Sequence, residues 1–211
     1  MKKIFALFTA FLLLFTACSP KEYTKREEYE DGDGYVITTY HDPQMEQNPV
    51  SLDFYDAEGS LSMHVAYEYD NNGRRVRTTQ SDSEGNVEQV VTNEYDKNGN
   101  LVRVVMTDGD GNKTTVLEND YTADGVIAES RNLHKGVLVS ITQYESDGIT
   151  ATRTDFNTDG TVMRYTTFEY DENGFQLTKF YTPDMVLTQS VQYTPEGPIV
   201  KNYDENGNET E

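Results

Sequence analysis

The chain has 211 residues, with 17 lysines and arginines against 37 aspartates and glutamates, and a formal net charge of −20 at pH 7. A chain this acidic repels nucleic acid and anionic lipid headgroups, which argues against a nucleic-acid partner. Apolar residues make up 36% of it, below the ~45–50% of typical globular domains, so a single deep core is not expected.

Residues 1–17 have the pattern of a secretory signal peptide. Two lysines follow Met1, then comes the nearly all-apolar run from Ile4 to Phe15, and then Thr16 and Ala17. The apolar run has about a dozen residues, and at about 1.5 Å per residue a helix of that length is too short for the ~30 Å hydrocarbon core of a bilayer. We therefore expect a cleaved signal rather than a permanent membrane span.

The segment from Leu14 to Cys18 resembles the lipobox of bacterial lipoproteins. That resemblance implies cleavage before Cys18 and a mature chain whose cysteine thiol carries diacylglycerol and anchors it to a membrane. Cys18 is the only cysteine, so it cannot form a disulfide within the chain. Ser19 stands where an aspartate would favour the inner membrane in many Gram-negative species. The resemblance therefore implies the outer membrane or cell surface in such a species.

We expect the lipidated cysteine to be followed by a charged tether, so that residues 18–33 form one linking segment. Charged side chains are dense from Thr24 to Asp33, and such runs are typical of solvated chain. A frayed first strand is the alternative for the same residues.

Residues 34–211 are predicted to form one repeat domain, because glycine recurs at near-regular spacing. Of the 15 glycines, 13 belong to one series, with steps of 11–14 residues between Gly59 and Gly174. Met185 occupies the glycine position of one unit, after Pro183-Asp184. One further turn is expected between Asp42 and Pro49.

The residues around these glycines predict β-hairpins. Tyr-Asp-x-Asn-Gly occurs four times, and Asn-Gly is a strong hairpin signal because both residues tolerate positive φ. Between the turns lie runs of about eight residues rich in Val, Thr, Ile and Tyr, which are strand signals. The sequence therefore predicts an all-β fold, a repetitive antiparallel meander of about 14 short strands in one curved or rolled, solenoid-like sheet, with no helix except the signal segment.

Tyrosine marks one edge of the predicted sheet. Successive turns of a meander lie on opposite edges, and six alternate turns all begin with tyrosine, whereas those between them begin with varied residues. These structural repeat tyrosines are Tyr69, Tyr95, Tyr121, Tyr144, Tyr170 and Tyr193. We expect them to stack along the edge, with each ring packing on the next hairpin. A stacking platform for sugars is the alternative.

The stretches Tyr67–Arg74, Ser81–Asn86 and Glu94–Leu101 resemble the YD repeat of the Rhs family, and the likeness extends over about residues 34–211. This resemblance implies a hairpin-repeat fold and a place at the cell surface. Large members of that family wind their repeats into a hollow shell around a toxin, and some are thought to bind carbohydrate. This chain is far too short to close such a shell, so the resemblance supports fold and location better than function.

Catalysis finds little support in the sequence. The one cysteine is assigned to the lipid anchor, and the three histidines, His41, His64 and His134, stand in no known catalytic motif. Paired carboxylates acting as acid and base are the remaining route to an enzyme.

Two aspartate–glycine stretches resemble the start of calcium-binding loops, with Asp31 and Asp33 in one and Asp108 and Asp110 in the other. Neither completes an EF-hand, because the second lacks the invariant glycine and the closing glutamate. Plain turns also select aspartate and glycine. We therefore expect solvated turn residues and no cofactor, with calcium as the alternative.

Taken together, these features predict a membrane-anchored, non-catalytic module at the cell surface or in the periplasm that binds a glycan or a protein. The open sheet end near the C-terminus is a candidate docking edge, because unpaired strands recruit others. The first alternative is a purely structural spacer or envelope component. The second is an enzyme with a carboxylate site that the sequence does not reveal.

Overall fold

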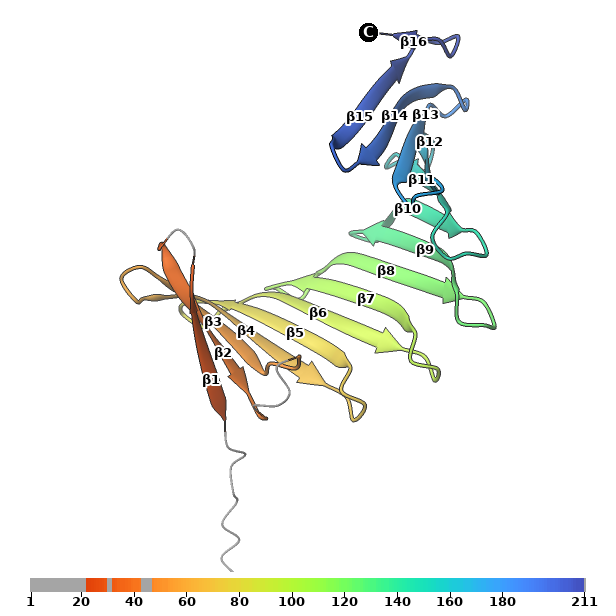
Figure 1. The fold of residues 1–211 in the computed structure, drawn as a ribbon. Coiled ribbons are helices and arrows are strands. Elements are labelled where there is room, and N and C mark those ends of the chain that lie inside the picture. Colours follow the sequence, from red (N-terminus) through yellow and green to blue (C-terminus); the bar gives the residue numbers. More distant parts are fainter. Residues whose placement is uncertain (1–21, 30–31, 43–46, 211) are drawn as a thin grey trace, which may run out of the picture.

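The computed structural model describes residues 22–29, 32–42 and 47–210. They form one antiparallel sheet of 16 strands, whose order in space is their order in the chain (Figure 1). The strands are β1 (Tyr23–Glu28), β2 (Gly34–Tyr40), β3 (Ser51–Asp56), β4 (Leu61–Tyr69), β5 (Arg75–Asp82), β6 (Val87–Tyr95), β7 (Leu101–Asp108), β8 (Lys113–Tyr121), β9 (Ile127–His134), β10 (Val137–Tyr144), β11 (Ala151–Phe156), β12 (Val162–Tyr170), β13 (Gln176–Tyr181), β14 (Leu187–Thr194), β15 (Gly197–Tyr203) and β16 (Glu209–Thr210). The predicted all-β meander in one sheet is confirmed.

The sheet is curved and open. In Figure 1 it runs from β1 at the left, through the middle strands, to β16 at the top, and the two terminal strands lie far apart. Among the described residues, β1 pairs with β2 alone and β16 with β15 alone. Among the residues that the structure describes, no helix is long and apolar enough to cross a bilayer.

The sheet has 16 strands rather than about 14, and the additional ones lie at its ends. Strand β1 falls within the segment expected to be a tether or a frayed strand, and it pairs with β2 through all six of its residues. Its charged side chains are partnered: the Arg26 guanidinium lies 3.5 Å from the centre of the Tyr35 ring and donates a 2.8 Å hydrogen bond to Glu28. Opposite charges paired two residues apart therefore make this segment an acceptable edge strand.

The turns are built by the aspartate that begins them. In the turn after β6, the Asp96 carboxylate accepts hydrogen bonds from the backbone N–H groups of Asn98 at 2.9 Å and Asn100 at 2.8 Å. The N–H of Gly99 donates to the Asp96 carbonyl at 3.1 Å. The side chain thus satisfies the backbone of its own turn, which explains why aspartate recurs at this position.

Positive φ explains the glycine series and also its one replacement. Met185 has φ of 62°, as expected from its glycine position. Gly109 lies outside the series, and glycine is required there for a different reason: a Cβ would collide with the carbonyl oxygen of Val87. The backbones approach each other closely at that point, and only glycine leaves room.

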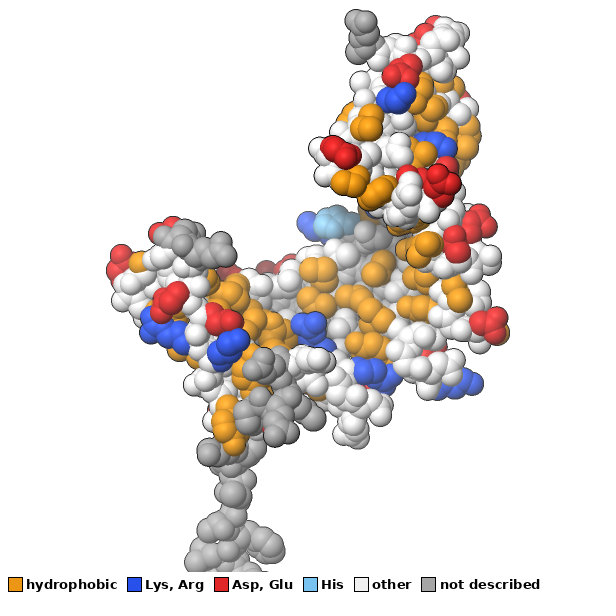
Figure 2. All heavy atoms as spheres, viewed as in Figure 1, with side chains coloured by type: hydrophobic (Ala, Val, Ile, Leu, Met, Phe, Trp, Pro, Cys, Tyr) orange, Lys and Arg blue, Asp and Glu red, His pale blue; other side chains and the backbone are white. Residues whose placement is uncertain are grey.

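The sheet has little conventional core. The buried hydrophobic side chains are Val65, Val105, Val116 and Ala151. Nine polar or charged residues are also buried among the described ones. Figure 2 shows hydrophobic side chains in patches on the surface of the middle and upper strands rather than hidden beneath a second layer. A single sheet leaves both of its faces accessible, which agrees with the low apolar content.

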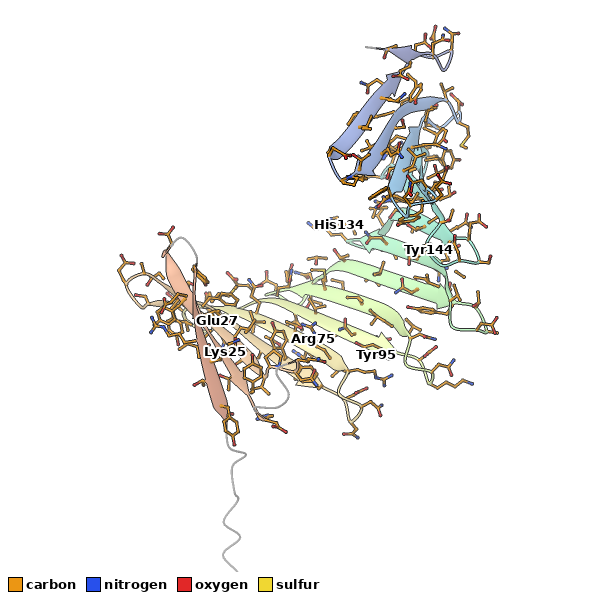
Figure 3. All side chains as sticks on the ribbon, in the orientation of Figure 1. Lys25, Glu27, Arg75, Tyr95, His134 and Tyr144 are labelled. Carbon is orange, nitrogen blue, oxygen red and sulfur yellow. The ribbon has the colours of Figure 1, made fainter. Side chains whose placement is uncertain are left out.

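Alternation along each strand and the register between strands place the repeat tyrosines on one face. The pairs Val65–Gln80 and Gln80–Gln89 carry the alternation from β4 to β6, and the same relation continues to β14. We call the side that bears Tyr69, Tyr95, Tyr121, Tyr144, Tyr170 and Tyr193 the tyrosine face, and the other side the opposite face. Tyr95 and Tyr144 are labelled near the turns of the same edge in Figure 3.

Candidate functional site

The first three repeat tyrosines close the edge of the sheet. The hydroxyl of Tyr69 donates to the carbonyl of Pro49 at 2.8 Å, that of Tyr95 to Arg75 at 3.0 Å, and that of Tyr121 to Leu101 at 3.0 Å. Each acceptor lies 20 residues earlier in the chain. These three tyrosines therefore pack on the preceding hairpin, and for them the expectation of packing on the next one is wrong.

Two residues at the end of the preceding turn hold Tyr95 in this direction. The guanidinium of Arg74 lies 4.6 Å from the centre of the Tyr95 ring, while the Arg75 carbonyl receives the hydroxyl. Burial raises the pKa of Tyr69 and of Tyr121 above the ordinary value, as expected for phenols that are partly removed from water. These tyrosines have a structural role.

An asparagine two residues before two of these tyrosines assists them. Asn93 and Asn119 each donate their side-chain amide at 2.9 Å to the carbonyl that also receives the hydroxyl of Tyr95 or Tyr121. Asn119 is 8% exposed, and its side-chain oxygen accepts a 2.6 Å hydrogen bond from Ser130. Sequence reasoning missed this Asn-x-Tyr pair, although it is visible in the strands that end at Tyr95 and Tyr121.

The repeat tyrosines nearer the C-terminus do not make this hydrogen bond from hydroxyl to backbone carbonyl. Tyr170 is 43% exposed and Tyr193 is 50% exposed, and neither hydroxyl hydrogen-bonds to a carbonyl among the described residues. Tyr144 is half-buried. The tyrosines, alike in sequence, therefore differ in role: the first three are structural rings, whereas Tyr170 and Tyr193 near the C-terminus are accessible.

The calcium candidates are not brought together. The Asp108 carboxylate accepts hydrogen bonds from the N–H groups of Asp110 at 3.1 Å and Asn112 at 2.8 Å. The Asn112 backbone N–H and then its side-chain amide lower the pKa of Asp108. Asp33 lies in a separate turn before β2, and Asp31 lies outside the described residues, as does Cys18. The described part of the chain contains no group of three or more His, Cys, Asp or Glu side chains able to hold a metal ion.

Three side chains on the opposite face form a row that resembles a catalytic triad. Asp53 and His64 are cross-strand neighbours with a 2.6 Å contact between Oδ1 and Nδ1, and His64 is paired in turn with Ser81 of β5. No hydrogen bond joins His64 to Ser81 in the described structure, and Ser81 is 8% exposed. The row therefore lacks the contact between nucleophile and base on which such catalysis depends.

A ladder of charges crosses the opposite face of β6 to β9. Arg103 lies 3.4 Å from Glu94 and 3.6 Å from Glu118, and Glu118 lies 3.7 Å from Arg131. Arg131 also contacts Asp120 at 2.8 Å and Glu129 at 2.6 Å. Exposed pairs of this kind contribute little singly, but the network partners the charges of this face with one another.

On β11 to β15 the tyrosine face differs from the opposite face. Here two accessible arginines lie above a floor of buried side chains. The floor consists of side chains that are 3–5% exposed: Ala151, Asp155, Thr166 and Thr178. Asp155 lies between two guanidiniums, because Arg153 and Arg164 each donate through Nε at 2.7 Å, one to each carboxylate oxygen. Both arginine side chains remain accessible, at 41% and 50%.

Two cavities adjoin this cluster and share Arg164 and Phe180. The smaller, of about 250 Å³, is lined by Arg153, Asp155, Arg164, Thr166, Phe168, Gln176, Thr178, Phe180 and Tyr193. The larger, of about 570 Å³, is lined by Met163, Arg164, Phe180, Tyr181, Thr182, Pro183, Thr188, Gln189 and Asn202. We call the two together the C-terminal groove. It combines aromatic rings, side-chain amides and a fixed pair of cations, which are the groups that orient small ligands.

Comparison with known proteins assigns no family. No protein-family model matches the chain, and no curated protein matches it. Among solved structures, a Tc holotoxin pore of Photorhabdus luminescens is similar at 13% identity with a TM-score of 0.31, covering 84% of this chain and 10% of that one. A porin-like protein of Bacteroides uniformis is similar at 12% identity with a TM-score of 0.32, covering 90% of this chain and 91% of that one.

A TcdB2–TccC3 structure is similar at 11% identity with a TM-score of 0.27, covering 87% of this chain and 14% of that one. The chain thus spans about a tenth of the holotoxin chain that it matches. At these scores the similarities assign neither a family nor a function.

Proposed function

We propose that the protein is an exported, lipid-anchored and non-catalytic repeat module that binds a glycan or protein ligand in the C-terminal groove. The observation that carries the binding role is the groove itself, with two adjoining cavities of about 250 Å³ and 570 Å³ that share Arg164 and Phe180. Concave sites of this size that join apolar walls to a few convergent polar groups are where proteins hold ligands. The recurrent Tyr-Asp-x-Asn-Gly turns support a relation to YD-type repeats.

Electrostatics supports the same location. Arg153 and Arg164 both use Nε on the buried Asp155, so the hydrogen bonds described for them leave their terminal nitrogens for another partner. The ladder on the opposite face contrasts with this, because its arginines contact several carboxylates each. A ligand therefore finds unshared cationic donors in the groove.

The test is a thermal-shift panel of envelope polysaccharides and candidate proteins on the chain from Ser19 onward, which contains every described residue. A ligand at 100 times its Kd stabilises by about 2.7 kcal/mol, which for a domain of this size raises Tm by about 5–10 °C. Phe180→Ala should abolish the shift because Phe180 lines both cavities. Tyr165→Ala is the matched control, because Tyr165 lies on the opposite face of β12. A shift that survives Phe180→Ala would place the ligand elsewhere.

A structural spacer is the second candidate, and the charge ladder with the tyrosine contacts favours it by bracing β4 to β9. A spacer would give a flat panel on a cooperatively folded protein. Deletion of a spacer protein would instead change the integrity of the cell envelope, and no added ligand would shift its Tm.

The lipid anchor is a separate part of the proposal and rests on the sequence from Leu14 to Cys18. Labelled palmitate should be incorporated by the wild type and not by Cys18→Ser. Cell fractionation should then release Cys18→Ser from the membrane fraction, whereas Ser19→Ala, a neighbouring control, should stay bound. Retention of Cys18→Ser in membranes would contradict the anchor.

A further inference from the structure

We infer that the ligand of the C-terminal groove is a glycan containing uronic acid, with a sugar carboxylate bound by Arg153 and Arg164. This inference rests on the binding role proposed above and names the ligand class. It starts from the charge on the tyrosine face. The residues that β11 to β15 place on that face include three charged ones, namely Arg153, Asp155 and Arg164.

These three residues make the groove a positive site on a strongly negative protein. Two guanidiniums and one carboxylate sum to a local charge of +1, whereas the whole chain carries −20. The rest of the chain acts weakly over distance, because at physiological ionic strength charges more than about 8 Å apart are largely screened. The groove therefore selects an anion, and the surrounding charge rejects anions elsewhere.

The geometry of the cluster suits a carboxylate. Asp155 is 3% exposed and receives one Nε from each arginine at 2.7 Å, so both guanidiniums are held in place before a ligand arrives. A guanidinium is planar and offers its remaining donors as a fork that matches a planar carboxylate. Two guanidiniums held by the same carboxylate therefore favour binding of a ligand anion at the surface of the cluster.

The other walls of the groove suit a sugar ring. The centre of the Phe180 ring lies 5.8 Å from the Arg164 guanidinium, and Tyr193, which also lines the smaller cavity, is 50% exposed. Gln189 and Asn202 share a 3.0 Å hydrogen bond in the larger cavity, and each amide retains further donors and acceptors. Flat rings beside side-chain amides can contact the faces and the hydroxyls of a pyranose.

An acidic peptide suits the groove less well. Strands β12, β13 and β14 are paired on both sides, so their backbone groups are used within the sheet and cannot align a peptide main chain. Recognition must come from side chains on a face rather than from a strand edge. The two adjoining cavities share Arg164 and Phe180, so neighbouring units of one oligomer can contact both.

The test is calorimetric titration of the chain from Ser19 onward with five probes. They are oligomers of galacturonate and of mannuronate, the fully methyl-esterified form of each, and an oligoglutamate of the same charge. We expect at least one uronate to bind, with its methyl ester and oligoglutamate weaker by at least about tenfold, the factor for losing one charged hydrogen-bond pair.

The variants separate charge from geometry. Arg153→Gln with Arg164→Gln should weaken uronate binding at least about tenfold, and Arg77→Gln with Lys201→Gln, which removes the same charge from the opposite face, should not. Arg153→Lys with Arg164→Lys keeps the charge but loses the fork, so it should also bind more weakly than the wild type. The lysine variant serves as the test if the glutamine variant does not fold, as judged by circular dichroism.

The inference is overturned if the methyl ester binds as tightly as the acid, if oligoglutamate equals the uronates, or if neither uronate binds. In each of these cases the proposed binding role is judged separately by the wider panel. A neutral glycan or a protein whose binding is lost in Phe180→Ala would preserve that role, whereas a panel with no such ligand would remove both.

Discussion

The shared carbonyl of Leu101 gives the sharpest test of how this thin sheet is held together. It receives the amide of Asn119 at 2.9 Å and the hydroxyl of Tyr121 at 3.0 Å. Tyr121→Phe removes one hydrogen bond and keeps the ring, so the expected loss is about 1 kcal/mol. Asn119→Ala removes the bond to Leu101 and the one from Ser130, with an expected loss of about 2 kcal/mol.

The double variant should lose more than the sum of the two single variants. Each single variant leaves the Leu101 carbonyl one side-chain donor, whereas the double variant leaves it neither. An unsatisfied acceptor costs more than an average bond contributes, so we expect an excess of about 1–2 kcal/mol. The site lies in the middle of the sheet, where neighbouring repeats on both sides depend on it, so local fraying cannot absorb the loss.

Urea unfolding and thermal unfolding, followed by circular dichroism, measure these differences. Tyr121→Phe alone should lower Tm by about 2–4 °C for a domain of this size. Tyr170→Phe is the matched control, because Tyr170 is 43% exposed, and it should leave Tm unchanged. Equal Tm values for Tyr121→Phe and Tyr170→Phe, or strictly additive losses in the double variant, would refute the reasoning.

Three further predictions concern the turns. The carboxyl pKa of Asp108 is lowered from 3.8, first by the Asn112 backbone N–H and then by its amide, so the stability from this group is present above that ordinary value and is lost as the pH falls through the lowered one. Asp108→Asn should therefore melt below the wild type at neutral pH and converge with it under acid, with Asp110→Asn as the control in a Tm-against-pH series. Met185→Gly should raise stability by about 0.5–1 kcal/mol, because it relieves a φ of 62° at a side chain that is 57% exposed, and Met185→Ala, which keeps a Cβ, should give no such gain in thermal unfolding. Gly109→Ala should lower stability by about 1–3 kcal/mol because its Cβ meets the Val87 carbonyl, and an unchanged urea midpoint would show that the backbone yields there.

Much of the fold could be predicted from the sequence because its contacts are local. Each strand pairs with its neighbours in the chain, so the turn chemistry alone sets the order of the sheet. The glycine series and the replacement at Met185 were readable for the same reason, since positive φ is demanded by a few adjacent residues. The edge strand β1 was less readable, because its charges are balanced by Tyr35 and by opposite charges two residues along the same strand.

The hairpin unit, the single sheet and the edge on which the tyrosines lie all follow from the amino-acid sequence. The contacts between repeats add which tyrosines are hydrogen-bonded, which way they pack, and that Arg153, Asp155 and Arg164 meet above a buried floor. Those outcomes depend on register and on the bulges at the strand ends, where one extra residue changes which side chains oppose each other. They depend also on the curvature that accumulates over many strands. The register between strands and the accumulated curvature cannot be read from any single repeat. The repeats alone therefore predict the sheet but not its groove.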